Sequence, residues 1–323
     1  MNKILHFGRS GVKGAVVCAA FAAMGVLASS CVRRDLYVKP DEGSVLLDFD
    51  WQKLAPGEAV PEQMTIYFYG SNGSLTRGLT ENGKFSGTLP SGNYKVLVLN
   101  ENVQGVGFTN MEDFDRAYAY ALPLNKKAEG DDMWIQEPGW LYSANIGELA
   151  ITKEDTVQRT LVPKPLVRRV VLNIRLTGDT QSVTDVSAAL TGVAPSVRLA
   201  TGVCGDGYAS ITELDPKPTE DGYSANVLVF GVAAINPDGS PADNSVRLGM
   251  NFSNGGSQTI EESISNGGIV DPTEIEININ MDIEVAATSA AGFSAKVTKW
   301  EVTGGDMNVD NRPGGVPLAG HEN

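Results

Sequence analysis

The stretch "TEIEININMDIEV", residues 273–285, indicates most clearly which kind of fold this chain adopts. Large apolar residues alternate with Glu, Asn or Asp along its whole length; they are Ile275, Ile277, Ile279, Met281 and Ile283. A period of two places all the apolar side chains on one face of a strand. The stretch therefore predicts a strand with one buried and one wet face, as is typical of an antiparallel sheet.

The same alternation recurs along the chain, in "SVLLDFDW", "MTIYFYG", "PSGNYKVLVLN" and "RRVVLNIRL". The one stretch with a helix-like start is 109–122, where Thr109 or Asn110 precedes acidic residues, and it predicts either a short helix or an irregular connection. With 36 glycines and 16 prolines between short strands, the composition favours an all-β sandwich fold.

The length of 323 residues favours two domains over one. The segment 154–165 ("EDTVQRTLVPKP") is the predicted joint between two sandwiches. We expect a signal peptide at residues 1–30 and a lipid-anchored linker at 31–43. An N-terminal sandwich at 44–162, a C-terminal sandwich at 163–303 and a flexible tail at 304–323 should follow.

The first thirty residues have the pattern of a secretory signal. Three basic residues precede the apolar run 15–27, which is too short to span the ~30 Å core of a bilayer as a helix. Ala28-Ser29-Ser30 before Cys31 is similar to the lipobox of bacterial lipoproteins, in which the cysteine is acylated. The alternative is an ordinary signal peptide that is cut near Ala28 and leaves a thiol. Acylation of Cys31 would anchor the chain stably in a membrane.

Charge and residue usage exclude several functions. The net charge of −14 disfavours nucleic acid as a partner. Two histidines, His6 and His321, lie in the predicted signal and tail, so we expect no catalytic residue, no cofactor and no metal site in the folded body. Cys204, which would remain after export and acylation, is predicted to be a small buried residue without a disulfide partner.

Two stretches could bind a ligand. Glu129, Asp131 and Asp132 could chelate calcium, although a solvated loop tip explains them better because the spacing of an EF-hand is missing. Aromatic residues at Trp134, Trp140 and Tyr142 could stack on sugars or anchor in a partner's pocket. Packing in the core is the alternative for these aromatic residues, and we favour it.

A resemblance to a known family rests on five segments that follow in one order: "CVRRDLYV", "FDW", "MTIYFYG", "LPSGNYKVLVLN" and "GFTNMEDFD". This N-terminal part resembles the fimbrillin-like lipoproteins of Bacteroidales, in particular a subgroup of unknown function with a Cys-x-x-(Arg/Lys)-Asp-Leu start. The resemblance implies two tandem transthyretin-like Greek-key β-sandwiches, anchoring in the outer membrane through a lipidated Cys31, and a non-enzymatic role as a pilus component or surface adhesin with other fimbrillin subunits as partners.

The resemblance also implies assembly by β-strand addition after a protease has removed an early strand. In this chain the removable strand would be Val45–Trp51, and the donor side chains would be Val297, Trp300 and Val302. No arginine lies between Asp35 and Thr76, so Lys53 is the candidate processing site beside Lys39. Either a protease of other specificity acts, or the subunit is never clipped and stays in the membrane. The competing function is a lipid-anchored surface protein that binds a host or microbial glycan through the aromatic stretch.

Overall fold

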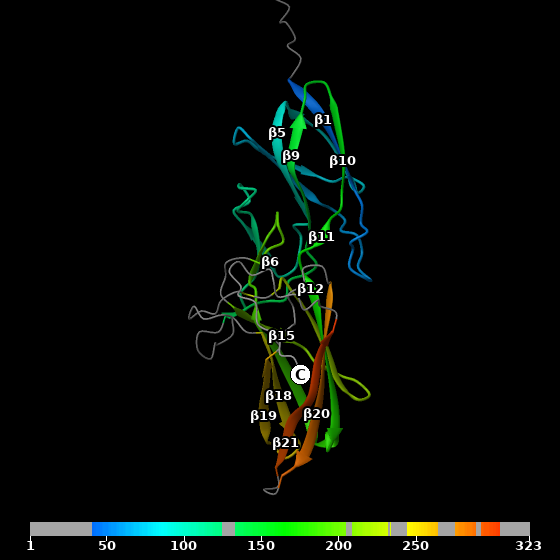
Figure 1. Ribbon diagram of the computed structural model, residues 1–323, viewed down its shortest axis with the longest axis vertical. Helices are drawn as coiled ribbons and strands as arrows, with labels where there is room; N and C mark the ends of the chain where they lie inside the picture. Colours follow the sequence, from blue (N-terminus) through cyan, green and yellow to red (C-terminus); the bar gives the residue numbers. More distant parts are fainter. Residues whose placement is uncertain are drawn as a thin grey trace, which may run out of the picture. The chain divides into compact units, whose positions relative to one another are not determined.

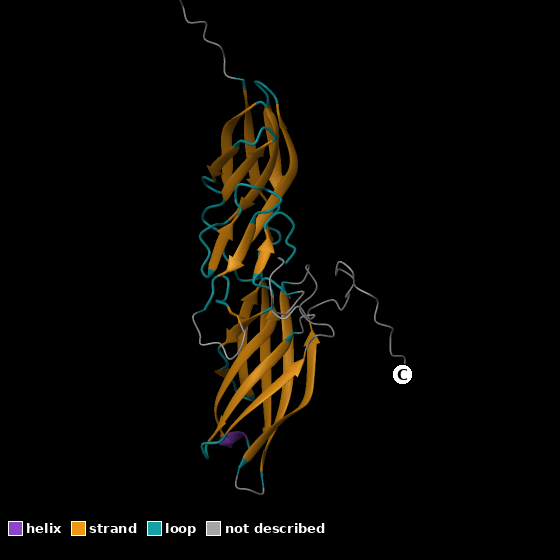
Figure 2. Ribbon diagram, turned by 90° about the vertical axis from the view of Figure 1, so that its left-hand side faces the viewer, coloured by secondary structure: helices purple, strands orange, loops and turns teal. Residues whose placement is uncertain are grey.

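The computed structural model describes residues 41–124, 133–204, 209–231, 233, 244–263, 275–288 and 292–303. Within these ranges the regular structure is almost entirely strand, and the one helical element is a three-residue turn at Thr180–Ser182 (Figure 2). The all-β prediction is therefore confirmed. The predicted signal peptide, Cys31 and the C-terminal tail lie outside the described residues, as do Glu129, Asp131 and Asp132.

Two sheets pack face to face in the first sandwich (Figure 1). The smaller sheet has the order β10-β1-β4, with strands β1 (Glu42–Phe49), β4 (Lys84–Pro90) and β10 (Thr156–Leu161). The larger has the order β11-β9-β5-β2-β3, with strands β2 (Thr65–Gly70), β3 (Leu75–Leu79), β5 (Gly92–Leu99), β9 (Tyr142–Ile151) and β11 (Lys164–Pro165). The strand β1 is central in its sheet, parallel to β10 and antiparallel to β4.

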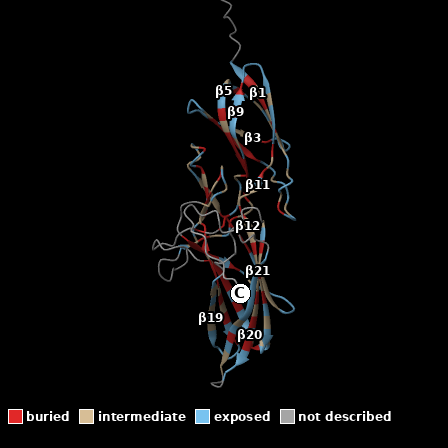
Figure 3. Ribbon diagram, viewed as in Figure 1, coloured by how far each residue is buried: buried red, intermediate tan, exposed pale blue. Residues whose placement is uncertain are grey.

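The core between these sheets follows the alternation in the sequence. Val45 and Leu47 of β1 are fully buried against the alternate residues of β2 and β5. Figure 3 shows buried residues along the strands of this sandwich. The opposite face of β5 is buried too, because Leu97 and Leu99 pack into a second hydrophobic cluster. The strands β2 and β5 of the larger sheet are therefore covered on both faces, whereas the edge strand β3 is largely exposed.

Part of the layer that covers this opposite face of β5 comes from residues 109–122. The sequence predicted either a short helix or an irregular connection for this segment. Within 109–122 no helix forms: the segment ends β6 (Val106–Thr109), turns, and continues as β7 (Tyr118–Ala121). The helix alternative is wrong because Asn110 has a positive φ of 54°, which breaks a helix, and the apolar residues that follow alternate as in a strand. β7 pairs with β6 and with β14 (Ser196–Arg198) in a separate small sheet.

The second sandwich also has two sheets. One has the order β16-β17-β12-β20-β21, with strands β12 (Arg168–Gly178), β16 (Lys217–Pro218), β17 (Gly222–Val229), β20 (Glu276–Ala287) and β21 (Phe293–Thr303). The other has the order β19-β18-β13-β15-β8, with strands β8 (Met133–Trp134), β13 (Val183–Val193), β15 (Ser210–Leu214), β18 (Ser245–Phe252) and β19 (Ser257–Ser263). The short β8 comes from the N-terminal half of the sequence and pairs in parallel with β15.

The strand that indicated the fold, β20, corrects one expectation. Its apolar face is buried as predicted, with Ile277, Ile279 and Ile283 fully covered. Its pairing is antiparallel only to β21, because its other neighbour β12 runs parallel to it over ten register pairs. Alternation reports which face is buried and contains no information about the direction of the neighbouring strand.

The predicted joint is shorter than expected. Within 154–165 the residues Thr156–Leu161 form β10, because they pair with the whole length of β1 from Ser44 onward. Two residues then lead into β11, which returns to pair with Tyr142 and Ser143 of β9. By contacts, the chain from Glu42 onward is one compact unit, and the division into two domains at residues 162 and 163 stays a prediction.

The burial pattern of β20 predicts how the truncation of a side chain on each of its two faces changes the stability of the protein. Ile279→Ala should lower the free energy of unfolding by about 2–5 kcal/mol, because truncation of a fully buried side chain leaves a cavity between β20 and the opposing sheet. Glu284→Ala, on the exposed face of the same strand, should change it by less than about 0.5 kcal/mol. Urea unfolding of the two variants checks this, and equal losses would contradict the assignment of the faces.

Candidate functional site

An aromatic cluster lies where β9 begins. The rings of Trp140 and Tyr142 stack at 6.3 Å between centroids, and Trp51 meets Tyr142 edge-on at 5.7 Å. Asn100, just after β5, holds this start in place: its side-chain nitrogen donates to the Trp140 carbonyl at 2.9 Å, and its side-chain oxygen accepts from the Tyr142 N–H at 2.7 Å. Trp140 packs against the core of the first sandwich and against the second hydrophobic cluster, the one that contains Leu97 and Leu99.

Arg169, the second residue of β12, completes this cluster. Its guanidinium lies 5.3 Å from the centre of the Trp140 ring. It forms ion pairs with Glu58 at 3.1 Å and with Glu276 of β20 at 3.6 Å. Because the Arg169 side chain is only 26% exposed, solvent screens these contacts less than it screens pairs on the open surface. One side chain thus joins the loop after β1 to the second sandwich.

The loop after β1 is fastened at a second point. The Tyr142 hydroxyl accepts a hydrogen bond from the N–H of Ala55 at 3.2 Å, and Ala55 is 2% exposed. Burial raises the pKa of the Tyr142 phenol above its ordinary value, so the neutral form is held in the core. Lys53, the predicted processing site, lies in the exposed turn between Trp51 and Ala55, where the Leu54 N–H donates to the Trp51 carbonyl at 3.0 Å.

The structure does not bring the three predicted ligand aromatics onto one surface. Tyr142 is 1% exposed and fills the core of the first sandwich, so its ring is not open to a sugar in this fold. Trp140 is half-buried beneath Arg169, and Trp134 lies on β8, beside β15 of the second sandwich. The placement of Tyr142 corresponds to the packing alternative.

The residues predicted for strand exchange lie in two well-defined places. Val45 and Leu47 are buried in the central strand of a three-stranded sheet, so removal of β1 would leave β4 and β10 without a neighbour on their facing edges. A slot of this kind is a template for another strand, because both exposed edges would present unpaired N–H and C=O groups.

Val297, Trp300 and Val302 share one face of β21. In the register with β20 they lie opposite Ile283, Met281 and Ile279, whose side chains are buried. The spacing of three between Val297 and Trp300 fits one face because the register shifts at this point and Thr298 is the extra residue. β21 is an edge strand, so Trp300 stays 37% exposed although it points to the core side.

The remaining predictions concern metals, membranes and the thiol. Cys204 is half-buried, and its thiol lies 3.7 Å from the Phe230 carbonyl, to which it donates. In the part of the chain that the structure describes, no cluster of three His, Cys, Asp or Glu side chains is arranged to hold a metal. In the same residues we find no helix of the length and apolarity needed to cross a membrane.

Sequence reasoning missed Asn100 and Arg169 as residues that organise this region. Arg169 contributes to the sequence patterns only as part of the alternating stretch "RRVVLNIRL", and no pattern singles out Asn100. The local pattern contains no signal for either, since their partners lie 42 residues away for the Asn100–Tyr142 hydrogen bond and 111 for the Arg169–Glu58 bond.

The fastening of the loop gives a prediction about cleavage at Lys53. Tyr142→Phe removes the acceptor of a buried N–H, which costs about 1–3 kcal/mol, so the loop should open more often and trypsin should cut after Lys53 several-fold faster. Tyr94→Phe is the matched control, because it removes a hydroxyl that bonds the Pro90 carbonyl in the same sandwich. Mass spectrometry of the fragments measures both rates, and equal acceleration in the two variants would contradict a specific role for Tyr142.

Comparison with known proteins places these features in a family. Residues 30–213 match the family model described as "Domain of unknown function (DUF5119)". A Bacteroides ovatus protein named as a candidate fimbrium anchoring subunit, Fim4B, is 28% identical over 138 residues. The match covers 42% of this chain and 40% of that protein, so the chain spans less than half of the relative's length.

Solved structures share the fold at low identity. A candidate adhesin from Bacteroides ovatus has a TM-score of 0.57 at 19% identity, over 81% of this chain and 95% of that one. The fimbrial anchor protein Mfa2 of Porphyromonas gingivalis has a TM-score of 0.53 at 9% identity, over 82% and 99%. A candidate polysaccharide-binding protein from Bacteroides thetaiotaomicron has a TM-score of 0.50 at 11% identity, over 84% and 100%. These likenesses concern the fold alone. Because the family model covers more than half of the sequence, this chain belongs to the family described as domain of unknown function DUF5119.

Proposed function

We propose that this protein is a non-enzymatic surface lipoprotein of a fimbrial system that keeps its first strand and holds the filament at the outer membrane. The observation on which this depends is the place of β1, the central strand of its sheet, joined to a fastened loop. The relative named as a candidate fimbrium anchoring subunit supports the same role. The lipid on Cys31 supplies the attachment in this proposal.

The position of β1 determines what the subunit can do in an assembly. While β1 stays between β4 and β10, the described residues leave no vacant place between these two strands for a strand from another subunit. The lack of arginine between Asp35 and Thr76 favours retention, as do the contacts of Glu58 and Ala55 in the loop that carries Lys53. A subunit that cannot accept a donor strand between β4 and β10 ends a filament, which is the place of an anchor.

The strand offered to the next subunit is β21 in this proposal. It is an edge strand near the end of the chain, and Val297, Trp300 and Val302 project from one face as side chains that fill pockets must. Donation requires that β21 leaves β20, where it pairs in this structure. We further propose that residues 44–162 and 163–303 are the two domains. In this proposal β1 fills the acceptor slot of the first domain, and the second domain contains the donor strand β21.

The alternative role as a carbohydrate-binding lipoprotein has weaker support. Stacking on sugars needs an exposed aromatic face. Tyr142 is buried, and the Trp140 ring already contacts the Arg169 guanidinium. A glycan role would therefore depend on Trp134 without the other two residues.

The state of the N-terminus tests the proposal directly. We expect intact-mass and N-terminal analysis of the protein from purified outer membranes to find an acylated Cys31 that is continuous with β1. A polypeptide that begins after Lys53, without Val45–Trp51, would instead identify a polymerising subunit and overturn the anchoring role. A chain that starts near Ser29 or Ser30 without lipid would overturn the lipoprotein assignment.

The donor strand gives a second prediction. Trp300→Glu should leave the fold intact, because the side chain is already 37% exposed, but it should release filaments from the cell, since a carboxylate cannot enter an apolar pocket without cost. Lys296→Glu, an exposed residue of the same strand, is the matched control and should retain filaments. The ratio of filaments in the medium to those on membranes measures the effect, and retention in both variants would exclude β21 as the donor.

A further inference from the structure

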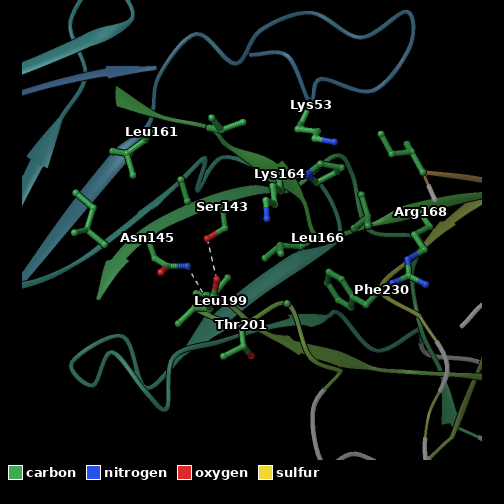
Figure 4. Close-up of a pocket in the computed structure, with 18 of the residues that line it drawn as sticks. Lys53, Ser143, Asn145, Leu161, Lys164, Leu166, Arg168, Leu199, Thr201 and Phe230 are labelled. Atoms are coloured by element: carbon green, nitrogen blue, oxygen red, sulfur yellow. Dashed lines mark hydrogen bonds between the residues drawn. The ribbon is translucent and has the colours of Figure 1, made fainter. Parts of the chain in front are cut away.

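A cavity of about 710 Å³ lies beside the seam between the two sheets of the first sandwich (Figure 4). β9 and β10 are consecutive strands that belong to different sheets, so they diverge after their connecting turn. The far wall is the segment Leu199–Gly202, which is held against β9 by hydrogen bonds from the Ser143 hydroxyl to the Leu199 carbonyl at 2.8 Å and from the Asn145 side-chain amide to the Ala200 carbonyl at 2.7 Å.

The lining of this cavity is cationic in a strongly acidic protein. Lys53, Arg159, Lys164 and Arg168 all line it, and no Asp or Glu does. The whole chain has a net charge of −14. In the described ranges, no carboxylate lies within ion-pairing distance of Lys53, Arg159 or Lys164, all of which are exposed. Like charges gathered on a concave surface attract a ligand of the opposite sign.

Two strand edges face the same cavity. On the side away from β5, β9 pairs with β11 only at Tyr142 and Ser143, and its next residues have no strand partner among the described residues. β10 pairs with β1 on one side, and in the same part of the chain its outer edge has no neighbour. Residues of both edges, among them Asn145 and Thr160, line the cavity. Open edges of this kind bind an extended peptide through its main chain.

The lining disfavours a sugar as the occupant. Its one aromatic side chain is Phe230, which is 2% exposed and therefore offers no face for stacking. The apolar part of the floor consists of aliphatic side chains such as Leu161 and Leu166. Cationic side chains, open main-chain edges and an aliphatic floor together match a peptide with acidic side chains.

We propose that this cavity is a docking site for an extended acidic segment of a partner protein, whose main chain lies along the β9 or β10 edge and whose carboxylates meet Lys53, Lys164 and Arg159. The site is distinct from the slot that β1 fills and does not need β21 to move. It therefore goes beyond the anchoring role, and its failure would leave that role standing.

The test measures binding of a short fluorescent peptide of alternating Glu and Thr to the full chain by anisotropy at low ionic strength. The expected result is saturable binding that weakens as salt is added, because mobile ions screen exposed charges. In Lys53→Gln/Lys164→Gln the affinity should fall by about tenfold, as expected for the loss of two partly exposed ion pairs.

The matched control is Lys153→Gln/Lys296→Gln, which makes the same change in net charge with two exposed lysines that do not line the cavity. It should bind as the unmodified chain does. Three further ligands separate the contributions of charge, main-chain pairing and ligand class to binding. They are a Gln/Thr peptide without charge, a Glu/Thr peptide with N-methylated amides that cannot pair with a strand edge, and oligogalacturonate as an acidic sugar. The first two should bind markedly more weakly than the Glu/Thr peptide, and the sugar should bind only weakly.

Four results would overturn the proposal. Equal losses in the two double variants would mean unspecific attraction, and equal binding of the Gln/Thr peptide would mean that the lysines do not select for charge. Equal binding of the N-methylated peptide would exclude the strand edge. Tighter binding of oligogalacturonate, abolished by Lys53→Gln/Lys164→Gln, would assign the cavity to an acidic glycan instead.

Discussion

The parallel pairing of β12 with β20 is the constraint on which the rest of the second sandwich depends. The two strands are separated by about a hundred residues, yet ten residue pairs lie in register. On the inner face Leu172 lies opposite Ile279, and both are fully buried. On the outer face the Asn173 side chain donates to that of Asn280 at 2.9 Å, and Arg175 forms a two-point contact with Asp282. A slip by one residue would reverse both faces, so this register is strongly specified.

The same pairing positions residues that act outside the sheet. Arg169 lies opposite Glu276 in the register, which places its guanidinium at the start of β12, within reach of Trp140 and Glu58. The first sandwich repeats the arrangement, since β1 also pairs in parallel with β10. In both halves the strand that begins the sandwich pairs with one that comes near its end. This pairing is why β1 is central, and why retention of β1 determines what the protein can accept from a neighbour.

The seam beside β9 follows from the same topology. A chain that moves from one sheet of a sandwich to the other with a short turn must separate the two strands as they leave the turn. β9 and β10 do so, and among the described residues the edge of β9 beyond Ser143 and the outer edge of β10 have no strand partner. Natural sheets protect such edges with charged side chains, lysine above all, to prevent aggregation. Lys164 and Arg159 meet this need, and the same positive charge makes the seam selective for an acidic segment.

The sequence by itself determined the all-β class and the buried faces of β1, β5, β12 and β20. These features are local, because a period of two is a property of neighbouring residues. The signal and lipobox patterns are local too, and they gave the expectation of a lipoprotein.

Only the tertiary structure decided the direction of the neighbours of β20, the strand at Thr156–Leu161, the bulge at Thr298 and the burial of Tyr142. It alone brought Asn100 to Tyr142, Arg169 to Glu58, and four cations to one cavity. Alternation fixes which face of a strand is apolar, whereas the identity of the strand beside it depends on the packing of the whole chain. Residues whose partners lie 40 to 111 positions away can therefore be assigned a role only once the sheets have formed.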